Sequence, residues 1–170
     1  IVLTKIDFNW DYCNKRSYNF INSKNPRKIK PKILNQEKIE SESGEIELYL
    51  NIKTVDKLFP NLIQYSPNLQ IAILLASTRL VGTKCPGMYS LYSEIKLSFT
   101  DKRGSGNLKY KVSKYDNRFN LVYMKISGAY VSGLIKSFIR PKESKQDSFK
   151  VIKKNVKKNE FIKQSAIIIG

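Results

Sequence analysis

The longest apolar stretch of the chain is NLQIAILLASTRLV, at residues 68–81. Its apolar side chains occupy too many positions for one stripe along a helix, and a helix of this kind is buried on most sides. Ser66 is a favourable N-cap, Pro67 suits the first helical position, and Gly82 is expected to end the helix. The segment is too short to span a bilayer, so we expect the rest of the chain to surround it.

Alternating apolar and polar residues predict β-strands on both sides of this helix. One strand is predicted before the helix, at residues 45–53. Four more are predicted after it, at residues 91–100, 108–115, 119–127 and 129–140. Gly104-Ser105-Gly106 and Asp116-Asn117 indicate tight turns between these strands, and strands joined by tight turns pair antiparallel. The pattern predicts an α+β domain with one antiparallel sheet around one buried helix.

These elements divide the chain into four parts. Residues 1–44 are expected to hold an N-terminal strand and an irregular basic segment, and residues 45–141 form the α+β domain. Residues 142–164 are charged and are interpreted as a linker that contains an amphipathic helix. Residues 165–170, SAIIIG, have the continuous apolar run of a strand that is covered on both faces.

The charge of the chain is strongly positive, with 31 Lys and Arg against 14 Asp and Glu and a net charge of +17. Such an excess is common in nucleic-acid-binding proteins. Most of the basic residues are Lys, however, which makes fewer bidentate contacts with bases and phosphates than Arg does. The chain is also rich in Ile, Asn, Tyr and Phe, the set that AT-rich codons favour. We therefore attribute the charge to general composition and expect no nucleic-acid partner.

Cysteine and histidine content limits the chemistry that the chain can support. The sequence contains Cys13 and Cys85 and no histidine, so neither a disulfide framework nor a zinc site of usual spacing is predicted. No signal peptide or membrane-spanning stretch is found either. A cytoplasmic protein without a cofactor or a membrane partner is the expectation.

Two segments around the central helix resemble a known family. Leu58-Phe59-Pro60, followed by Pro67-Asn68-Leu69-Gln70-Ile71, is similar to the H-F-P…P-G-x-L-Q-x-E-A segment of the β-hydroxyacyl-thioester dehydratases. The strand series at residues 99–140 resembles that of the same fold and of the MaoC-like hydratases. The resemblance covers residues 45–141. It implies a hotdog fold, in which an antiparallel sheet wraps a long central helix, and a partner that is an acyl-CoA or an acyl-carrier protein.

The catalytic groups of that family are missing at the matching positions. Its catalytic histidine corresponds to Leu58, its catalytic acid to Ala72, and the glutamine after that acid to Ala76. The Asp…Asn…His motif of MaoC-like hydratases has no counterpart, because the chain contains no histidine. Hydration of a thioester needs groups that move a proton and handle the β-oxygen, and Leu and Ala do neither. The catalytic residues are therefore unknown, and a domain without the usual activity is expected.

The last residues carry a second resemblance. Ala166-Ile167-Ile168-Ile169-Gly170 is similar to the first strand of a short-chain dehydrogenase, at the point where the glycine-rich nucleotide loop would begin. The resemblance implies that the chain is the N-terminal part of a fusion to such a reductase.

Candidate substrate-binding residues gather at the predicted start of the helix. In hotdog enzymes, as the resemblance implies, the N-terminus of the central helix polarises the thioester carbonyl, and free N–H groups favour the negative charge that develops there. Tyr65, Ser66, Asn68 and Gln70 lie in this region, although Ser66 is more simply a helix cap. Arg79, inside the helix, is a candidate for binding a carboxylate or a pantetheine phosphate, but we favour an arginine that reaches solvent or pairs across a dimer.

Other reactive residues are better explained by structure. Cys85 follows Lys84, which favours a thiolate, but no histidine is present to act as a base. Glu94 is expected on a solvent-facing strand position, so paired-carboxylate chemistry is not predicted. Lys109, Lys111 and Lys114 are expected on a solvated sheet face, with an acidic carrier protein or a CoA phosphate as the alternative.

Three functions agree with these features. The first is a hotdog domain that binds acyl thioesters without the usual hydratase or dehydratase activity. The second is an active hydratase, dehydratase or thioesterase with an unusual site. The third is a structural dimerisation module of an attached reductase. In each case a homodimer is expected, because an exposed edge strand needs covering.

Overall fold

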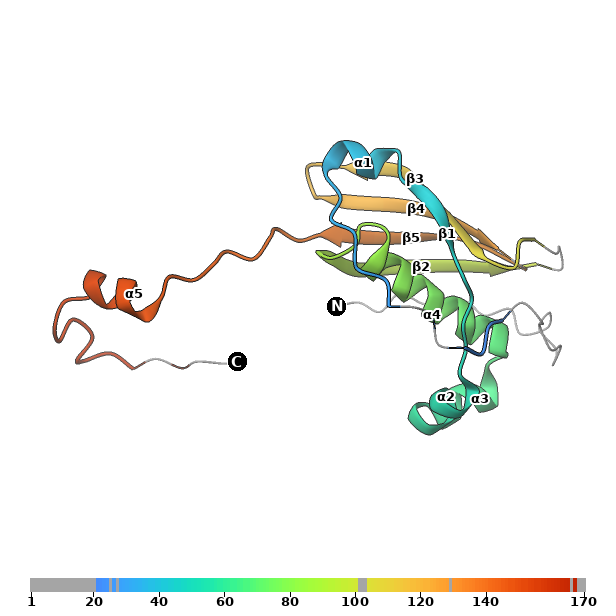
Figure 1. Ribbon diagram of the computed structural model, residues 1–170, viewed down its shortest axis with the longest axis horizontal. Helices are drawn as coiled ribbons and strands as arrows, with labels where there is room; N and C mark the ends of the chain where they lie inside the picture. The colour runs from blue at the N-terminus through green and yellow to red at the C-terminus, as the bar shows by residue number, and fades with distance from the viewer. Residues whose placement is uncertain are drawn as a thin grey trace.

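Helix α4 (Asn68–Thr83) lies across one face of a five-stranded antiparallel sheet (Figure 1). In sequence, α4 is placed between strands β1 (Ser43–Ile46) and β2 (Ser90–Phe99). A sheet that wraps one long central helix is the hotdog arrangement, so the predicted fold class is confirmed. The computed structural model describes residues 21–24, 26, 28–100, 104–128, 130–165 and 167. The strand predicted at the start of the chain lies outside them.

Three further strands complete the sheet: β3 (Leu108–Asp116), β4 (Leu121–Gly128) and β5 (Val131–Ile139). The strand order is β1-β3-β4-β5-β2, and every neighbouring pair is antiparallel. The turn predicted at Asp116-Asn117 joins β3 to β4 as a hairpin and is confirmed. The hairpin predicted at residues 104–106 is wrong, because β2 pairs with β5 while β3 lies between β1 and β4.

The start of α4 differs from the prediction at Ser66. A short helix, α3 (Pro60–Tyr65), precedes α4, and the Ser66 N–H donates to the Leu62 carbonyl oxygen at 2.9 Å. Ser66 therefore ends α3 and does not cap α4. Pro67 occupies the N-cap position of α4 and makes no side-chain hydrogen bond. The first N–H groups of α4 are consequently left without a capping side chain at this position.

The end of α4 lies beyond Gly82, at Thr83. A Cβ at Gly82 would meet open space, so this glycine is an ordinary helical residue. Gly87 is different, because its φ is +91° and a Cβ there would lie 2.2 Å from the carbonyl oxygen of Lys32. Only glycine fits such a place without strain. The chain thus turns at Gly87.

The strand predicted at residues 45–53 is only partly present, because β1 covers just its beginning. Helix α2 (Ile52–Leu58) starts within the predicted strand, and the Asn51 side chain caps it by accepting a hydrogen bond from a backbone N–H of its first turn at 3.1 Å. Leu48 and Leu50 are nevertheless buried. The alternation therefore identified an extended segment with one packed face, of which only the first part pairs in the sheet.

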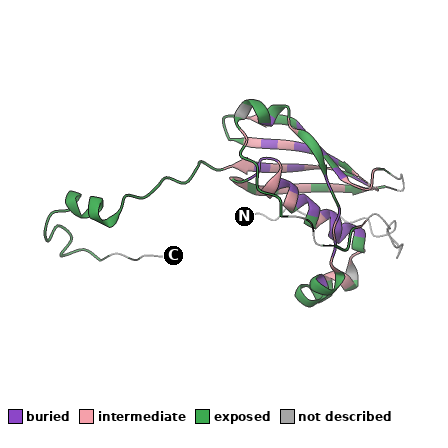
Figure 2. Ribbon diagram, in the orientation of Figure 1, coloured by how far each residue is buried: buried purple, intermediate pink, exposed green. Residues whose placement is uncertain are grey.

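The sheet has an inner face toward α4 and an outer face toward solvent, and Figure 2 shows the buried residues on α4 and on the strands. Buried inner-face residues of the central strands are Leu108, Tyr110, Val112, Val122, Met124, Ile126 and Ile135. Lys109 and Lys111 alternate with them on β3 and are exposed, as predicted. Lys114 is also exposed as predicted, but it reaches the outer face through a register shift between Val112 and Lys114 that the alternation did not indicate.

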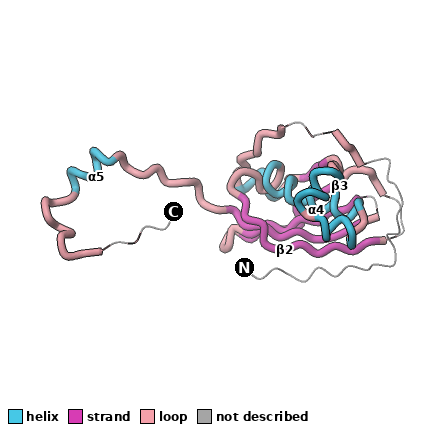
Figure 3. The backbone as a smooth tube through the Cα atoms, turned by 90° about the horizontal axis from the view of Figure 1, so that it is seen from below, coloured by secondary structure: helices cyan, strands magenta, loops and turns pink. Residues whose placement is uncertain are grey.

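Two short helices lie outside the sheet. Helix α1 (Gln36–Glu40) falls in a segment predicted to be irregular, and Asn35 caps it by accepting from the Lys38 N–H at 3.2 Å. Helix α5 (Phe149–Asn155) lies in the predicted linker, which extends away from the sheet in Figure 3. Residues 142–165 are exposed throughout (Figure 2). Among the described helices, none combines the length and the apolar character that crossing a membrane requires. Most of the strand predicted at residues 165–170 lies outside the described residues.

Candidate functional site

Gln70 lies in the first turn of α4 and is fully buried, at 0 % exposure. Neither its amide oxygen nor its amide nitrogen has a hydrogen-bond partner among the described residues. A buried polar group left without a partner costs about 1–3 kcal/mol. Helical side chains also lean toward the N-terminus of their helix, which directs this amide toward the uncapped start of α4. The position thus combines buried, unused hydrogen-bonding groups with a helix N-terminus.

A shallow groove of about 510 Å³ lies next to this helix start. Its lining residues are mainly apolar and come from the end of α2 and from α3: Leu58, Phe59, Pro60, Asn61, Leu62 and Ser66. Leu58 and Phe59 are largely exposed, at 62 % and 56 %. The groove is therefore an apolar surface open to solvent beside the polar start of α4.

The structure brings three of the five predicted site residues to this region. Ser66 is half-buried in the groove, Asn68 is exposed on the first turn of α4, and Gln70 is buried behind it. Tyr65 is the last residue of α3, and its side chain lies outside what is described.

Arg79 lies elsewhere. It follows Gln70 by nine residues, which is roughly two and a half turns at ~3.6 residues per turn, so the two side chains leave opposite sides of α4. A guanidinium nitrogen of Arg79 donates to the Glu47 carbonyl oxygen, while Nε and the other terminal nitrogen are buried without a partner in the described chain. Burial lowers the pKa of Arg79, and the Glu47 carboxylate opposes that effect.

A cavity of about 630 Å³ adjoins Arg79. Arg79 and Lys84 bring positive charge to its wall, and Glu45 and Glu47 bring negative charge. The formal charges of the wall therefore cancel, which gives an anion no clear preference for this cavity. The predicted site is thus divided, with Arg79 separate from the helix start.

A polar contact between α4 and the sheet was not predicted. Ser77 is fully buried on α4; its hydroxyl donates to the Leu74 carbonyl oxygen at 2.7 Å and accepts from the Tyr92 hydroxyl at 2.9 Å. Burial raises the pKa of Tyr92 to about 12. Ser137, the cross-strand neighbour of Tyr92, is buried with no partner among the described residues. Ser77 lies seven residues after Gln70, so both face the sheet side of α4.

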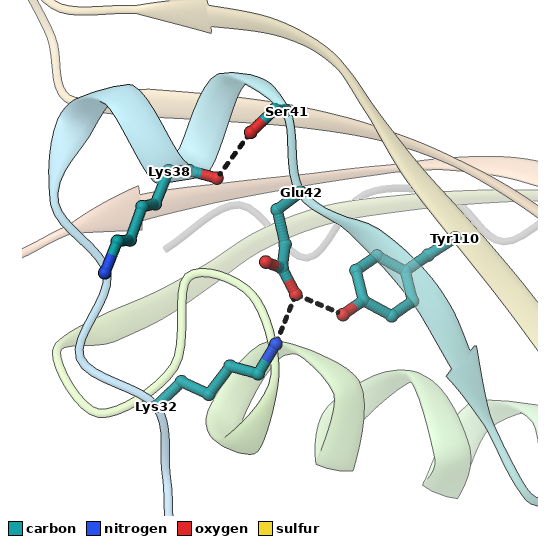
Figure 4. Close-up of polar contacts among 5 residues, drawn as sticks. All are labelled: Lys32, Lys38, Ser41, Glu42 and Tyr110. Carbon is teal, nitrogen blue, oxygen red and sulfur yellow. Dashed lines mark hydrogen bonds and ion pairs between the residues drawn. The ribbon is translucent and has the colours of Figure 1, made fainter.

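A second polar cluster lies near the C-terminal end of α4 (Figure 4). The Glu42 carboxylate accepts from Lys32 Nζ at 2.6 Å and from the Tyr110 hydroxyl at 2.8 Å. Cys85 is fully buried nearby, and burial raises the pKa of its thiol to about 12, with the Glu42 charge acting in the same direction. A buried, protonated thiol is a poor nucleophile, so the structural interpretation of Cys85 is supported.

Glu94, an acidic residue of β2, is held in ion pairs. Glu94 lies on the outer face of β2, where its carboxylate pairs with Lys136 at 2.6 Å and Lys96 at 3.2 Å. The hydrogen bond from Lys136 holds the pKa of Glu94 below its ordinary value. Within the described ranges, no three His, Cys, Asp or Glu residues gather where they could hold a metal ion.

The chain is similar in structure to a solved protein. No family model matches the sequence, and no curated protein does. An (R)-hydratase from A. caviae involved in PHA biosynthesis is similar in structure, with 16 % sequence identity and a TM-score of 0.46. The match covers 62 % of this chain and 100 % of the hydratase. The fold is established by the strand order and the central helix, and not by this likeness.

Proposed function

We propose that this chain is a hotdog domain that binds acyl thioesters of CoA or of an acyl-carrier protein at the start of α4. The observation that carries the proposal is Gln70, which is fully buried with both polar side-chain atoms unpartnered in the described chain. A thioester carbonyl accepts hydrogen bonds, and the Gln70 amide and the free N–H groups of the first turn are donors. The helix dipole favours partial negative charge at this end.

The apolar groove of α2 and α3 supports the same proposal. A thioester has an apolar acyl chain on one side of its carbonyl, and the lining of the groove ends at Ser66, two residues before α4 begins. Binding pockets for small molecules are commonly apolar with a few placed polar groups. Leu58, at the position where the dehydratases carry histidine, lines this groove and enlarges its apolar surface.

Catalysis of the usual kind is not part of the proposal. In the resemblance to the dehydratases, Leu58 and Ala72 fall at the positions of the histidine and the acid, and neither side chain transfers a proton. The proposed domain is therefore dehydratase-like but binds its thioester without the usual hydration. An active hydratase, dehydratase or thioesterase that uses Gln70 and its neighbours is the alternative.

Replacing Gln70 by Leu tests the proposal. Leu is similar in size and has no polar atoms, so we expect Gln70→Leu to raise the melting temperature of the free protein by removing an unpaired buried amide. The same variant should abolish the thermal shift that crotonyl-CoA gives the wild type. Gln64→Leu, on the exposed side of α3, is the matched control and should keep that shift.

The outcomes separate the candidate functions. A crotonyl-CoA shift that survives in Gln70→Leu would contradict the proposed site. Turnover of crotonyl-CoA by the wild type that is lost in Gln70→Leu would support the active enzyme. No shift and no turnover in the wild type would leave a structural dimerisation module, which the exposed edge strand β2 favours. The attached reductase remains part of that third candidate.

A further inference from the structure

Lysines form a row across the outer face of the sheet. The cross-strand register places Lys111 of β3 opposite Lys125 of β4, Lys125 opposite Leu134 of β5, and Leu134 opposite Lys96 of β2. Neighbouring strands lie about 4.8 Å apart. The three lysines thus lie on one line across the sheet, with Leu134 between two of them.

A shallow groove of about 550 Å³ runs over this part of the sheet. On the outer face its side chains are Lys109, Lys111, Lys125, Ser127, Ser132 and Leu134, and the lysines and serines are exposed. We call these six residues the lysine groove. Its surface offers cationic and hydroxyl donors around one apolar side chain.

The lysines of the groove differ from their neighbours on the same face. Lys96 and Lys136 share the Glu94 carboxylate, whereas Lys111 and Lys125 form no ion pair with any described residue. Like charges directly opposite each other on antiparallel strands are destabilising. The pair therefore carries an unfavourable interaction that an anionic partner would remove.

We propose that the lysine groove binds an acidic surface of another protein. Charge complementarity selects the partner, because a second copy of this chain would bring +17 to a positive face. Carboxylates spaced along a strand or a helix of the partner match Lys109, Lys111 and Lys125 on two neighbouring strands. Leu134, next to Lys125 on β5, provides an apolar contact.

Nucleic acid fits the groove less well. Sheets that bind single strands stack the bases on exposed aromatic side chains, and no aromatic side chain of the outer face lines the groove. Tyr123, in the adjoining row, is half-buried and has Lys114 and Lys136 over its ring at 5.8 and 5.7 Å. The ring of Tyr123 is therefore already in contact with two lysine side chains.

This site is independent of the proposed thioester site. The lysine groove lies on the outer face, whereas α4 and Gln70 lie on the inner face. A substitution in the groove should leave any effect of crotonyl-CoA unchanged, so failure of one proposal is distinguishable from failure of the other.

A polyglutamate peptide tests the inference, with single-stranded DNA of equal charge as the competing probe. Lys111→Gln with Lys125→Gln should weaken polyglutamate binding at low salt by about tenfold, or ~1.4 kcal/mol. The control is Lys153→Gln with Lys154→Gln on exposed α5, which removes the same charge and should keep the affinity within about twofold. Lys111→Arg with Lys125→Arg should also keep it, because the charges remain.

Three results would overturn the inference. One is the absence of polyglutamate binding by the wild type. Another is an equal loss in the groove variant and in the α5 control, which would mean attraction by net charge alone. The third is that the wild type binds the DNA more tightly than polyglutamate and that the groove variant abolishes this DNA binding. That result would make the groove a nucleic-acid site. Melting curves of the free variants check folding, and the groove variant should melt at the wild-type temperature or higher because the like-charge pair is gone.

Discussion

Two buried polar side chains of α4 are in opposite situations. The Ser77 hydroxyl has a donor and an acceptor, Tyr92 and the Leu74 carbonyl, and so fits the interior at little cost. Gln70 is equally buried, but neither of its polar atoms has a partner in the described chain. An unpaired amide weakens the fold, so stability alone does not account for Gln70. The proposed binding role would account for its amide nitrogen, because a thioester carbonyl would accept a hydrogen bond from it.

Cys85 leads to a prediction about reactivity. Burial raises the pKa of its thiol from 9.0 to about 12, so the folded protein holds the neutral thiol where an unfolded chain would ionise. In a Cys13→Ser background, we expect iodoacetamide to label Cys85 at pH about 9 only as fast as the protein opens. Denaturant should make labelling rapid.

The same shift contributes to the dependence of stability on alkaline pH. The Cys85 thiol has a pKa near 9.0 in the unfolded chain and near 12 in the folded protein. The stability that the neutral buried thiol contributes is therefore fully present below pH 9.0, and it is lost as the pH rises toward 12. Rapid labelling of the native protein would contradict the burial of Cys85.

At the scale of elements, the two glycines at the end of α4 make a matched pair. Gly87→Ala should destabilise the protein by at least about 1–3 kcal/mol, because the residue has a φ of +91° and its Cβ would meet the Lys32 carbonyl oxygen. Gly82→Ala should stabilise the protein by up to about 1 kcal/mol, because Gly82 is helical with open space around it. Urea unfolding of both variants measures the difference. Equal changes in the free energy of unfolding would contradict the assignment of Gly82 to the interior of α4 and of Gly87 to the turn.

The pairing of β2 with β5 has a pH-dependent component. Lys136 holds the pKa of Glu94 below its ordinary value of 4.5, so the ion pair contributes stability above pH 4.5 that is lost as pH falls through the folded pKa. Glu94→Gln should therefore be less stable than the wild type at neutral pH, and the gap should narrow in acid. Urea midpoints measured across this range test it, with Glu143→Gln on the exposed tail as the control. A gap that stays constant with pH would contradict the role of the ion pair.

Local pattern predicted most of the elements, and the failures come from short helices and from contacts between residues far apart in the chain. The alternation of β2 to β5 located these strands within a few residues, since one face of each packs on α4. Ser66 was misassigned because the α3 helix before it is short and lacks a clear apolar period. The Glu42–Tyr110 hydrogen bond joins residues 68 positions apart, which no local pattern reveals.

The candidate site was predictable to a similar extent. Gln70 was identified as a polar residue within an apolar helix, which is a local signal. The separation of Arg79 from it follows from helix geometry, but the groove of α2 and α3 depends on helices that the sequence pattern did not indicate. Ser137 was missed because a single serine on a strand is unremarkable until its burial is known.

At the scale of the whole molecule, the edge of the sheet favours dimerisation and the net charge opposes it. Strand β2 is an edge of the sheet, and pairing of two β2 strands would join two copies into a homodimer. Two chains of +17 repel each other, however. Raising salt from roughly 0.1 M to roughly 1 M shortens the Debye length from about 10 Å to about 3 Å, which weakens that repulsion but leaves strand hydrogen bonds in place.

Sedimentation at these two salt concentrations should therefore show a dimer fraction that rises with salt. Binding of polyglutamate by the lysine groove should fall over the same range, because screening weakens an attraction between opposite charges. The groove variant serves as an internal control. It should bind polyglutamate about tenfold more weakly and still dimerise, since the groove lies on the outer face and β2 pairs through its edge. A chain that stays monomeric at both salts would contradict the homodimer, and a dimer fraction that falls with salt would mean that ion pairs, rather than strand pairing, hold the copies together.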